Sequence, residues 1–410
     1  MGFTTSYASV TWTAGDVITE AKLDNMVAND QAYNSHAAQG IELDEMSKPS
    51  NPASGKLRIY AKDKDGVSTL YYLKDDGTEV EIGVSSNGSS GIFRQAIVNG
   101  GCEVNQAVTA VSLTDGKLFG SVDMFYAKGA GTAVSAGTIG QATAANVGNS
   151  GYALKLAGVT ISGTGIVHAY TFIESKNAKL YKNKTASFSV KVYHDVGSAI
   201  DYTIKINKAD SEDDFSAVTN IDSADAQSVP NTTETEIKFE NVDLGDCSNG
   251  IEIEIMVECG AITTKNFEFG DWQFNEGETV SDFVCKNYQK TLWDCYRYLY
   301  AFVSVATLSP VGYGFASTTT VARIYCPLPM EMLKTPTLVG TASDFELSDG
   351  VSAGIDLTDI GILGLSDGKV FATTIQATVA SGLTQYRTYL LRANNSENKI
   401  LLINARPTIA

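Results

Sequence analysis

Residues 186–193 read Ala-Ser-Phe-Ser-Val-Lys-Val-Tyr, so that apolar side chains at 186, 188, 190 and 192 alternate with serine and lysine. A period of two is that of a β-strand with one buried face. Similar short runs, separated by turn-rich segments, occupy residues 153–156, 169–173, 235–239 and 251–255. They predict an antiparallel two-sheet sandwich of the jelly-roll type over residues 92–282, each sheet having one apolar and one polar face.

The C-terminal part of the chain, residues 283–410, predicts a second β-domain. Residues 283–298 predict a short helix at its start. Runs rich in β-branched and aromatic residues then follow at 313–315, 320–324, 335–339, 370–375, 386–390 and 399–403.

The N-terminal residues 1–46 have a different pattern. Thr19 is suited to cap a helix, and apolar side chains including Leu23 and Met26 recur every three or four residues after it, which predicts a short helix over 19–36. A helix of this length with polar residues in its apolar stripe is marginal alone, so we expect it to bind a partner.

Residues 47–91 predict a linker and a β-meander. A segment rich in proline and serine, 47–55, precedes three strand-like runs that are separated by Asp65-Gly66 and Asp76-Gly77. Asp-Gly between such runs is a strong hairpin signal. The fold class expected for the whole chain is therefore mainly β: a short N-terminal helix, a three-stranded β-meander, a jelly-roll sandwich and a C-terminal β-domain.

Composition excludes several classes of partner. The 410 residues include 30 Lys and Arg against 47 Asp and Glu, a net charge of −17. Proteins that bind nucleic acid or anionic membrane surfaces normally supply cations, so we expect neither partner. No apolar run is long enough to predict membrane insertion. The six cysteines are scattered without a Cys-x-x-Cys pair, and we expect reduced, mostly buried thiols.

The sequence gives no signature of catalysis, metal binding or a cofactor. The three histidines lie far apart, and phosphate-binding, dinucleotide-binding and nucleophile-elbow motifs are missing. Paired carboxylates in a cleft could hydrolyse a glycoside, but 47 acidic residues leave any such pair unassigned. The acidic run 210–214 is interpreted as a solvated loop, with a calcium-binding loop as the alternative.

Several segments, in chain order, resemble phage virion appendage proteins: tail fibres, tail spikes and head fibres. The first resembling segment is 11–25, Thr-Trp-Thr-Ala-Gly-Asp-Val-Ile-Thr-Glu-Ala-Lys-Leu-Asp-Asn, and the second is the meander. Further segments that carry the resemblance are 94–106, 267–277, 295–298, 314–319, 328–330 and 334–337. Segment 94–106 resembles the start of a carbohydrate-binding-module-like jelly roll, but Val104-Asn105-Gln106 replaces the usual Trp-Gln-Arg. Ligand-binding residues therefore stay unassigned.

The resemblance implies a virion protein, made in the cytoplasm of the bacterial host, with no enzymatic activity. Trp12, Asp16, Leu23 and Met26 are the expected anchoring residues, binding a phage tail, portal or capsid protein. The β-domains are expected to bind host cell-surface polysaccharide without cleaving it. A purely structural head-fibre, collar or decoration protein is the first alternative, and a glycan depolymerase is the second.

We predict that the full-length protein is a homotrimer. The helix and the meander are each too small to bury an apolar face alone, and the resembling fibres are trimeric. Apolar burial must then outweigh the repulsion among chains that each carry a charge of −17. Light scattering at physiological salt measures the mass directly, and a monomer at micromolar concentration contradicts the prediction.

Overall fold

The computed structural model describes residues 44–64, 67–82, 95–131, 133–351, 353–363, 372–394 and 397–409. It is mainly β, with 53% strand and 5% helix, which confirms the predicted fold class. The helix predicted over 19–36, and with it Trp12, Asp16, Leu23 and Met26, lies outside the described residues. Among the described helices, none has the length and apolar character needed to cross a membrane.

The chain divides into two compact units, residues 1–88 and 89–410. In the first unit, β1 (Arg58–Lys64), β2 (Val67–Leu73) and β3 (Glu79–Glu81) form an antiparallel sheet in the order β1-β2-β3, as the meander pattern predicts. Gly77 has a φ of +88° in the turn between β2 and β3, a conformation that favours glycine. Tyr60 and Leu73 are buried.

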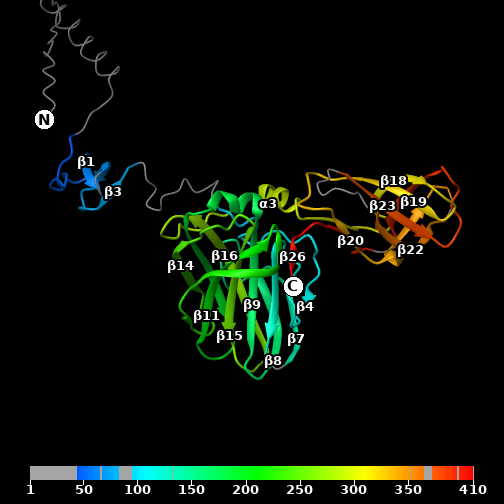
Figure 1. The fold of residues 1–410 in the computed structure, drawn as a ribbon, viewed down its shortest axis with the longest axis horizontal. Coiled ribbons are helices and arrows are strands. Elements are labelled where there is room, and N and C mark those ends of the chain that lie inside the picture. Colours follow the sequence, from blue (N-terminus) through cyan, green and yellow to red (C-terminus); the bar gives the residue numbers. More distant parts are fainter. Residues whose placement is uncertain are drawn as a thin grey trace, which may run out of the picture. The chain divides into compact units, whose positions relative to one another are not determined.

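The second unit begins with a sandwich of two facing sheets (Figure 1). One sheet has the order β14 (Thr235–Asp243), β10 (Thr185–His194), β16 (Ile262–Glu276), β8 (Ala153–Ser162), β7 (Ala133–Ala142) and β4 (Val111–Ser112). The other has the order β26 (Thr408–Ile409), β12 (Asp214–Ser223), β11 (Ile200–Ser211), β15 (Gly250–Glu258), β9 (Ile166–Glu174), β6 (Phe125–Ala130) and β5 (Leu118–Phe119), with β13 (Gln227–Val229) beside β11.

Aromatic side chains from both sheets fill the sandwich core. The ring of Trp272 on β16 lies 5.0 Å from that of Phe125 on β6 and 5.9 Å from that of Phe188 on β10. Every second residue of β15, including Ile251, Ile253 and Ile255, is fully buried, so this strand shows the expected alternation on its core face.

The outer face of β16 is polar, as the alternation predicts, but it is buried. Glu268, Gln273 and Asn275 alternate with the core phenylalanines, yet each is 1–3% exposed. Loops cover this face and satisfy its polar groups: Asn146 donates its backbone N–H to Glu268 over 2.6 Å, and the Gln95 amide donates to Gln273 over 2.9 Å. Polarity in the sequence therefore does not report exposure here.

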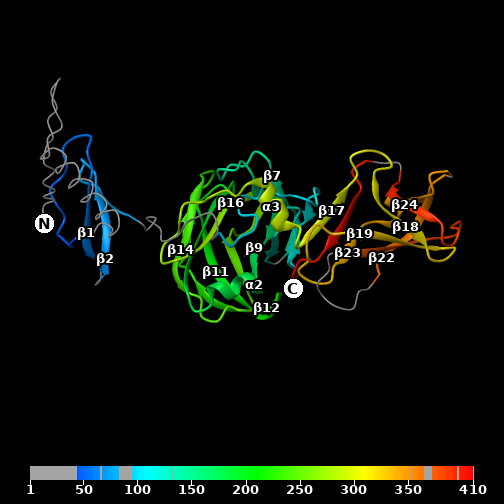
Figure 2. The same ribbon diagram turned by 90° about the horizontal axis from the view of Figure 1, so that it is seen from above.

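The C-terminal part contains a closed barrel of strands β18 (Pro310–Ala316), β19 (Val321–Pro327), β23 (Ala372–Val379), β22 (Ile355–Ile362), β21 (Phe345–Ser348) and β24 (Thr388–Ala393). A separate three-stranded sheet has the order β17 (Leu299–Val303), β25 (Ile400–Asn404) and β20 (Thr337–Val339), so its strands come from before, after and within the barrel sequence. The helix predicted within 283–298 is confirmed as α3 (Tyr288–Cys295), which lies over the end of the sandwich beside β17 (Figure 2).

The end of the chain returns to the sandwich, which the sequence did not predict. Thr408 and Ile409 in β26 pair in parallel with Asp214 and Phe215 at the start of β12. Gln106 forms a second link: its amide donates to the carbonyl of Leu299 over 2.8 Å and accepts from the N–H of Ala301 over 3.3 Å. The pairing of β26 with β12 and the bonds of Gln106 to β17 therefore both connect the sandwich to the C-terminal part.

A buried acid lies at this junction. Asp123 accepts hydrogen bonds from the backbone N–H of Gln106 over 2.9 Å and from its side-chain amide over 2.5 Å. Burial raises the pKa of Asp123 from 3.8 to about 6, although these bonds and the charge of Arg406 oppose the shift. Burial also lowers the pKa of Arg406 to about 10, and its guanidinium stacks 4.2 Å over the Phe119 ring.

We predict that ionisation of Asp123 destabilises the fold. Because its folded pKa of about 6 exceeds the ordinary 3.8, the native state holds the proton more tightly, and stability falls as the pH rises from 3.8 through 6. Because a pKa shift of one unit corresponds to about 1.4 kcal/mol, the free energy of unfolding falls by about 3 kcal/mol over this range. Denaturant unfolding gives the free energy of unfolding of the wild type and of Asp123→Asn between pH 4 and 7. The change with pH in the difference between these two free energies measures the loss. A difference that does not vary with pH contradicts the prediction.

Candidate functional site

An open groove of about 650 Å³ lies at the end of the sandwich next to α3. We call it the end groove. The lining residues come from the segment before the first sandwich strand, from the short helices after β9, and from the region around α3: Gln95, Ala96, Val98, Glu174, Asn177, Leu180, Tyr181, Val284, Cys285, Lys286, Asn287, Lys290, Asp294, Arg297, Tyr298 and Met330. The volume is within the range of about 300–1,000 Å³ that small-ligand sites occupy.

One wall is formed by α2 (Ser175–Ala178) and the single turn η1 (Lys179–Tyr181). They contribute Asn177, Leu180 and Tyr181. Leu180 is 65% exposed, which leaves this wall accessible from solvent, whereas Tyr181 is buried against the ring of Phe274 at 5.2 Å. The wall thus offers an amide, an aliphatic side chain and an aromatic edge.

The opposite wall is formed by α3. Asn287 caps the helix by accepting a hydrogen bond from the N–H of Gln289 over 2.9 Å, which satisfies one of the free backbone donors of its first turn. Lys290 and Asp294, one turn apart, form an ion pair at 2.5 Å on the groove side of the helix. The Lys290 side chain is 61% exposed and can reach a ligand.

The groove ends at a buried ion pair. The Nε of Arg297 donates to Glu174 over 2.7 Å, and its Nη1 donates to the carbonyl of Glu331 over 3.2 Å. Burial opposes the positive charge, but the carboxylate of Glu174 outweighs it and raises the pKa of Arg297. Glu174 therefore positions Arg297 through a charge-assisted hydrogen bond.

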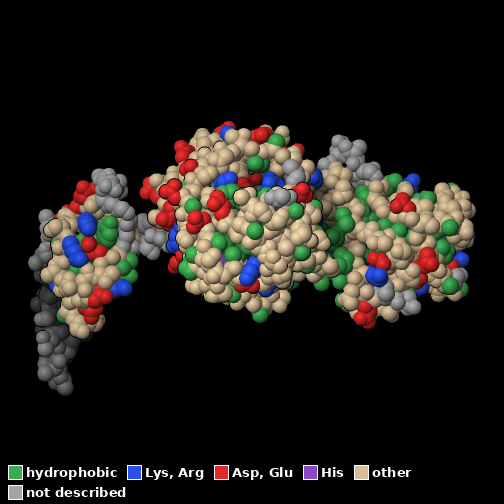
Figure 3. Space-filling view, turned by 90° about the horizontal axis from the view of Figure 1, so that it is seen from below, with side chains coloured by type: hydrophobic (Ala, Val, Ile, Leu, Met, Phe, Trp, Pro, Cys, Tyr) green, Lys and Arg blue, Asp and Glu red, His purple; other side chains and the backbone are tan. Residues whose placement is uncertain are grey.

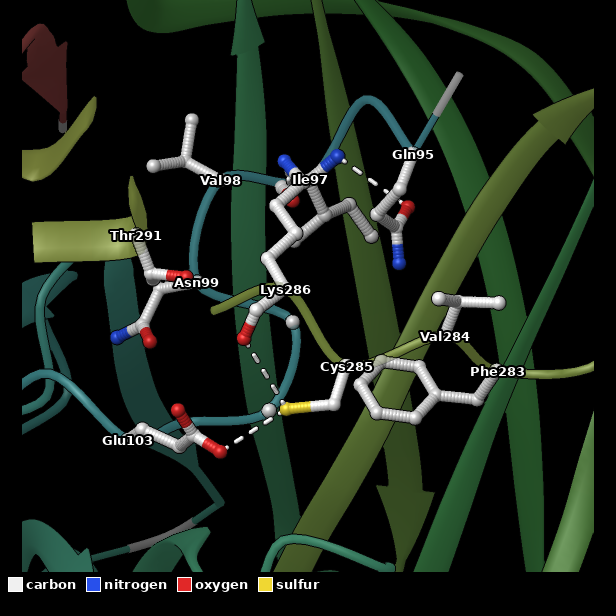
Figure 4. A pocket seen from close by; sticks show the side chains of 12 residues that line it. Gln95, Ile97, Val98, Asn99, Glu103, Phe283, Val284, Cys285, Lys286 and Thr291 are labelled. Atoms are coloured by element: carbon white, nitrogen blue, oxygen red, sulfur yellow. Dashed lines mark hydrogen bonds between the residues drawn. The ribbon is translucent and has the colours of Figure 1, made fainter. Parts of the chain in front are cut away.

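A small pocket beside the groove contains the exposed cysteine of the chain (Figure 4). The Sγ of Cys285 points toward Glu103 and donates to its carboxylate over 2.9 Å. Partial burial and this carboxylate together raise the pKa of the thiol to about 12. Nucleophilic cysteines have a lowered pKa, so Cys285 is not suited to nucleophilic chemistry.

Lys286 supplies a cation to both cavities. Its Nζ donates to the carbonyl of Ile97 over 3.2 Å, and burial lowers its pKa. Lys286, Lys290 and Arg297 face the carboxylates of Glu174 and Asp294, and the latter two are paired with Arg297 and Lys290. The groove therefore has a local excess of positive charge, although the chain as a whole is acidic. Acidic side chains are more frequent than basic ones on the sandwich face that Figure 3 shows.

A second polar cluster lies on the outer face of the other sheet. The rings of Tyr126, Tyr170 and His168 stack in sequence at 5.0 and 5.9 Å. Tyr126 donates to Glu252 over 2.5 Å, and the ring of His168 hydrogen-bonds to Glu254 over 2.6 Å. Both tyrosines are at most 1% exposed, so the cluster stabilises the sheet and offers little surface to a ligand.

The amide of Asn207 lies 3.2 Å from an oxygen of Glu252 and 3.4 Å from one of Glu254, so the two carboxylates are neighbours. Burial raises the pKa of Glu254, but the hydrogen bond and charge of His168 outweigh it and lower the value to about 2. Glycoside hydrolysis needs a carboxylic acid that keeps its proton at neutral pH. Glu254 is ionised and cannot supply it.

The acidic run 210–214 forms a hairpin turn, with Asp210 and Ser211 in β11 and Asp214 in β12. Asp213 accepts from the N–H of Ser175 over 2.6 Å, and Glu212 accepts from Lys179 over 3.0 Å. These carboxylates therefore hold α2 in place. Within the described part of the chain, no group of three or more His, Cys, Asp or Glu side chains could hold a metal ion.

All six cysteines are free and five are buried, as predicted. The groove residues were not predicted individually. Arg297 and Tyr298 belong to the segment that carried the resemblance at 295–298, which is the sequence signal closest to the site. The remaining lining residues are ordinary in type, and only folding brings segments 95–98, 174–181 and 284–298 together.

Comparisons with known proteins give distant similarities. No protein-family model and no curated protein matches the chain. Similar solved structures include the module TmCBM61 in complex with β-1,4-galactotriose (11% identity, TM-score 0.27, 45% of this chain and 99% of that one). Another is the C-terminal family 22 carbohydrate-binding module of Clostridium thermocellum Xyn10B (15%, 0.28, 50% and 99%). A third is the enzymatically active domain of bacteriophage CBA120 tailspike protein 4 (11%, 0.28, 45% and 21%). At these TM-scores the similarities carry no argument about function.

We predict that Glu103→Gln makes Cys285 more reactive. Removal of the carboxylate lowers the thiol pKa from about 12, and each unit raises the thiolate fraction about tenfold. Iodoacetamide labelling between pH 7 and 10, with the modified residue located by mass spectrometry, measures the rate. The exposed Glu278→Gln is the control that should leave the rate unchanged. Equal rates in all three proteins contradict the assignment.

Proposed function

We propose that this protein is a structural appendage of a phage particle that binds a surface glycan without cleaving it, through the end groove. The observation that supports this best is the groove itself: an open cavity of about 650 Å³ with hydrogen-bonding side chains held on two short helices. In proteins of this architecture, ligand-binding residues are concentrated on loops and short helices that a rigid sandwich holds in position.

The chemistry of the lining suits a saccharide. Asn177, Lys286 and Lys290 can hydrogen-bond to hydroxyl groups, and Leu180 and Tyr181 provide apolar contact for the ring carbons. Affinity at a single site of this kind is expected to be modest, and several copies on one particle raise avidity.

Binding without cleavage is favoured because the carboxylates of the groove are already engaged. Glu174 pairs with Arg297, and Asp294 pairs with Lys290. The lowered pKa of Glu254 argues in the same direction for the cluster on the other sheet. Hydrolysis needs one protonated and one free carboxyl group on either side of a glycosidic bond.

Attachment to the particle is assigned to the N-terminal residues 1–46, with Trp12, Asp16, Leu23 and Met26 as anchors to a tail, portal or capsid protein. Trimerisation is supported by the meander, where Leu57 and Ile59 are 58% and 54% exposed. Apolar side chains exposed on so small a sheet favour contact with further copies.

We predict that a double variant, Asn177→Ala with Lys290→Gln, binds glycan about tenfold more weakly than the wild type. The probe is an immobilised set of bacterial capsular and O-antigen polysaccharides, with full-length protein in solution. Lys176→Gln is the matched control, because Lys176 is exposed on α2 and does not line the groove.

Each other outcome has a distinct meaning. Release of reducing ends from a bound polysaccharide makes the protein a depolymerase. Binding to none of the polysaccharides favours the purely structural head-fibre, collar or decoration protein. Undiminished binding by the double variant places the glycan site outside the groove.

A further inference from the structure

Three aromatic side chains are exposed together on the outside of the C-terminal barrel. Tyr313 on β18 is 73% exposed, Tyr325 on β19 is 60% exposed, and Phe315 on β18 is 46% exposed. On β19, exposed residues such as Tyr325 alternate with buried ones such as Ile324. The exposure of Tyr325 therefore follows from the two-residue period of a β-strand. Large aromatic residues gathered on an exposed sheet face are characteristic of an interaction site.

The pairing of the strands brings these rings side by side. Tyr313 lies directly opposite Tyr325, and Phe315 lies opposite Arg323, in the antiparallel register of β18 and β19. The two strands pack closely because β18 has Gly314 on its inner side, where an added Cβ would lie 1.8 Å from the carbonyl oxygen of Arg323. Cross-strand neighbours of this kind have Cβ atoms about 5 Å apart.

Polar side chains continue both rows onto the next strand. Gln376 on β23 lies opposite Arg323, and Thr374 lies opposite Tyr325. We define Tyr313, Phe315, Arg323, Tyr325 and Gln376 as the barrel platform. It combines flat apolar rings with a guanidinium and an amide, all on the rigid strands of a closed barrel.

The platform has an unusual charge for this chain. The four strands β18, β19, β23 and β24 contain no Asp or Glu, although the chain has 47. The other arginine of these strands, Arg392, pairs with Glu346 at 2.6 Å. Within the described residues, Arg323 has no ion pair at 4.0 Å or less, and it is exposed. Among the described residues, the platform therefore presents a guanidinium without an ion-pair partner next to aromatic rings.

We propose that the barrel platform is a second ligand site, separate from the end groove, which takes an acidic saccharide. The apolar C–H face of a pyranose ring packs on Tyr313 and Tyr325, while a carboxylate substituent pairs with Arg323 in the fork geometry that guanidinium groups favour. Gln376 is placed to hydrogen-bond to a ring hydroxyl. An acidic ligand follows from charge complementarity, since no carboxylate of the four strands competes for Arg323.

A second copy of the chain fits the platform less well. A stable interface between proteins buries about 1,200–2,000 Å² in total around an apolar core. Here the rings are bordered by the polar side chains of Thr374, Gln376 and Thr388, and by the half-buried Leu390 opposite Tyr313. Polar side chains so close to the three rings suit a single saccharide chain better than the apolar core of a protein interface.

The test uses full-length protein carrying Asn177→Ala and Lys290→Gln, so that the end groove contributes equally little throughout. The probes are immobilised bacterial polysaccharides that contain uronic acids, and the same polymers after reduction of their carboxyl groups to alcohols. We expect this protein to bind at least one acidic polymer, about tenfold more weakly once its carboxyl groups are reduced.

Arg323→Gln should cause the same loss on the native polymer and no further loss on the reduced one. Tyr313→Thr with Tyr325→Thr should abolish binding to both, and threonine keeps the strand propensity at these positions. Tyr288→Ala, which removes a tyrosine 51% exposed on α3, is the control expected to bind normally.

The inference is overturned if the protein binds no uronate-containing polysaccharide, or if the double tyrosine variant binds as well as its parent. It is also overturned if that variant changes the oligomeric mass measured by light scattering, because the platform is then a contact between subunits. None of these results depends on the groove, whose own test compares different variants with the wild type.

Discussion

The side-chain amide of Gln95 holds the outer face of β16, and the candidate site depends on this contact. It donates to the carbonyl of Trp272 over 2.6 Å and accepts from the N–H of Phe274 over 3.0 Å, so it pairs with the strand as a neighbouring backbone would. Because Gln95 is 7% exposed, loss of these bonds would leave buried backbone groups unpaired, at a cost of about 1–3 kcal/mol each. The same contact fixes segment 95–98 as one border of the end groove.

Gln106 has an equivalent role between the sandwich and the C-terminal part. Its amide pairs with Leu299 and Ala301 on β17, while Asp123 and the returning strand β26 fix the same junction from the sandwich side. Two glutamine side chains therefore hydrogen-bond to strands β16 and β17 as a neighbouring backbone would.

The features that the sequence predicted correctly are those that depend on residues close together in the chain. The alternation at 186–193 and 251–255 gives strands β10 and β15, and the Asp76-Gly77 turn gives the meander, because side-chain period and turn chemistry act over a few residues. The burial of Glu268 and Gln273 could not be predicted in this way, because loops distant in the sequence cover them and form their hydrogen bonds. The end groove and the pairing of β26 with β12 arise from contacts between residues far apart in the chain, which no single-sequence period encodes.

The charge of the chain and the character of its two candidate sites are compatible because they act over different distances. A net charge of −17 repels an acidic polysaccharide at long range, but physiological salt screens exposed charges beyond about 8 Å. Within that distance, the proposed ligand meets Lys286 and Lys290 in the groove or Arg323 on the barrel platform, where carboxylates are either paired or missing from the strands. In both proposals the local cations select the anionic group that is bound, while the acidity of the rest of the chain disfavours adsorption to nucleic acid.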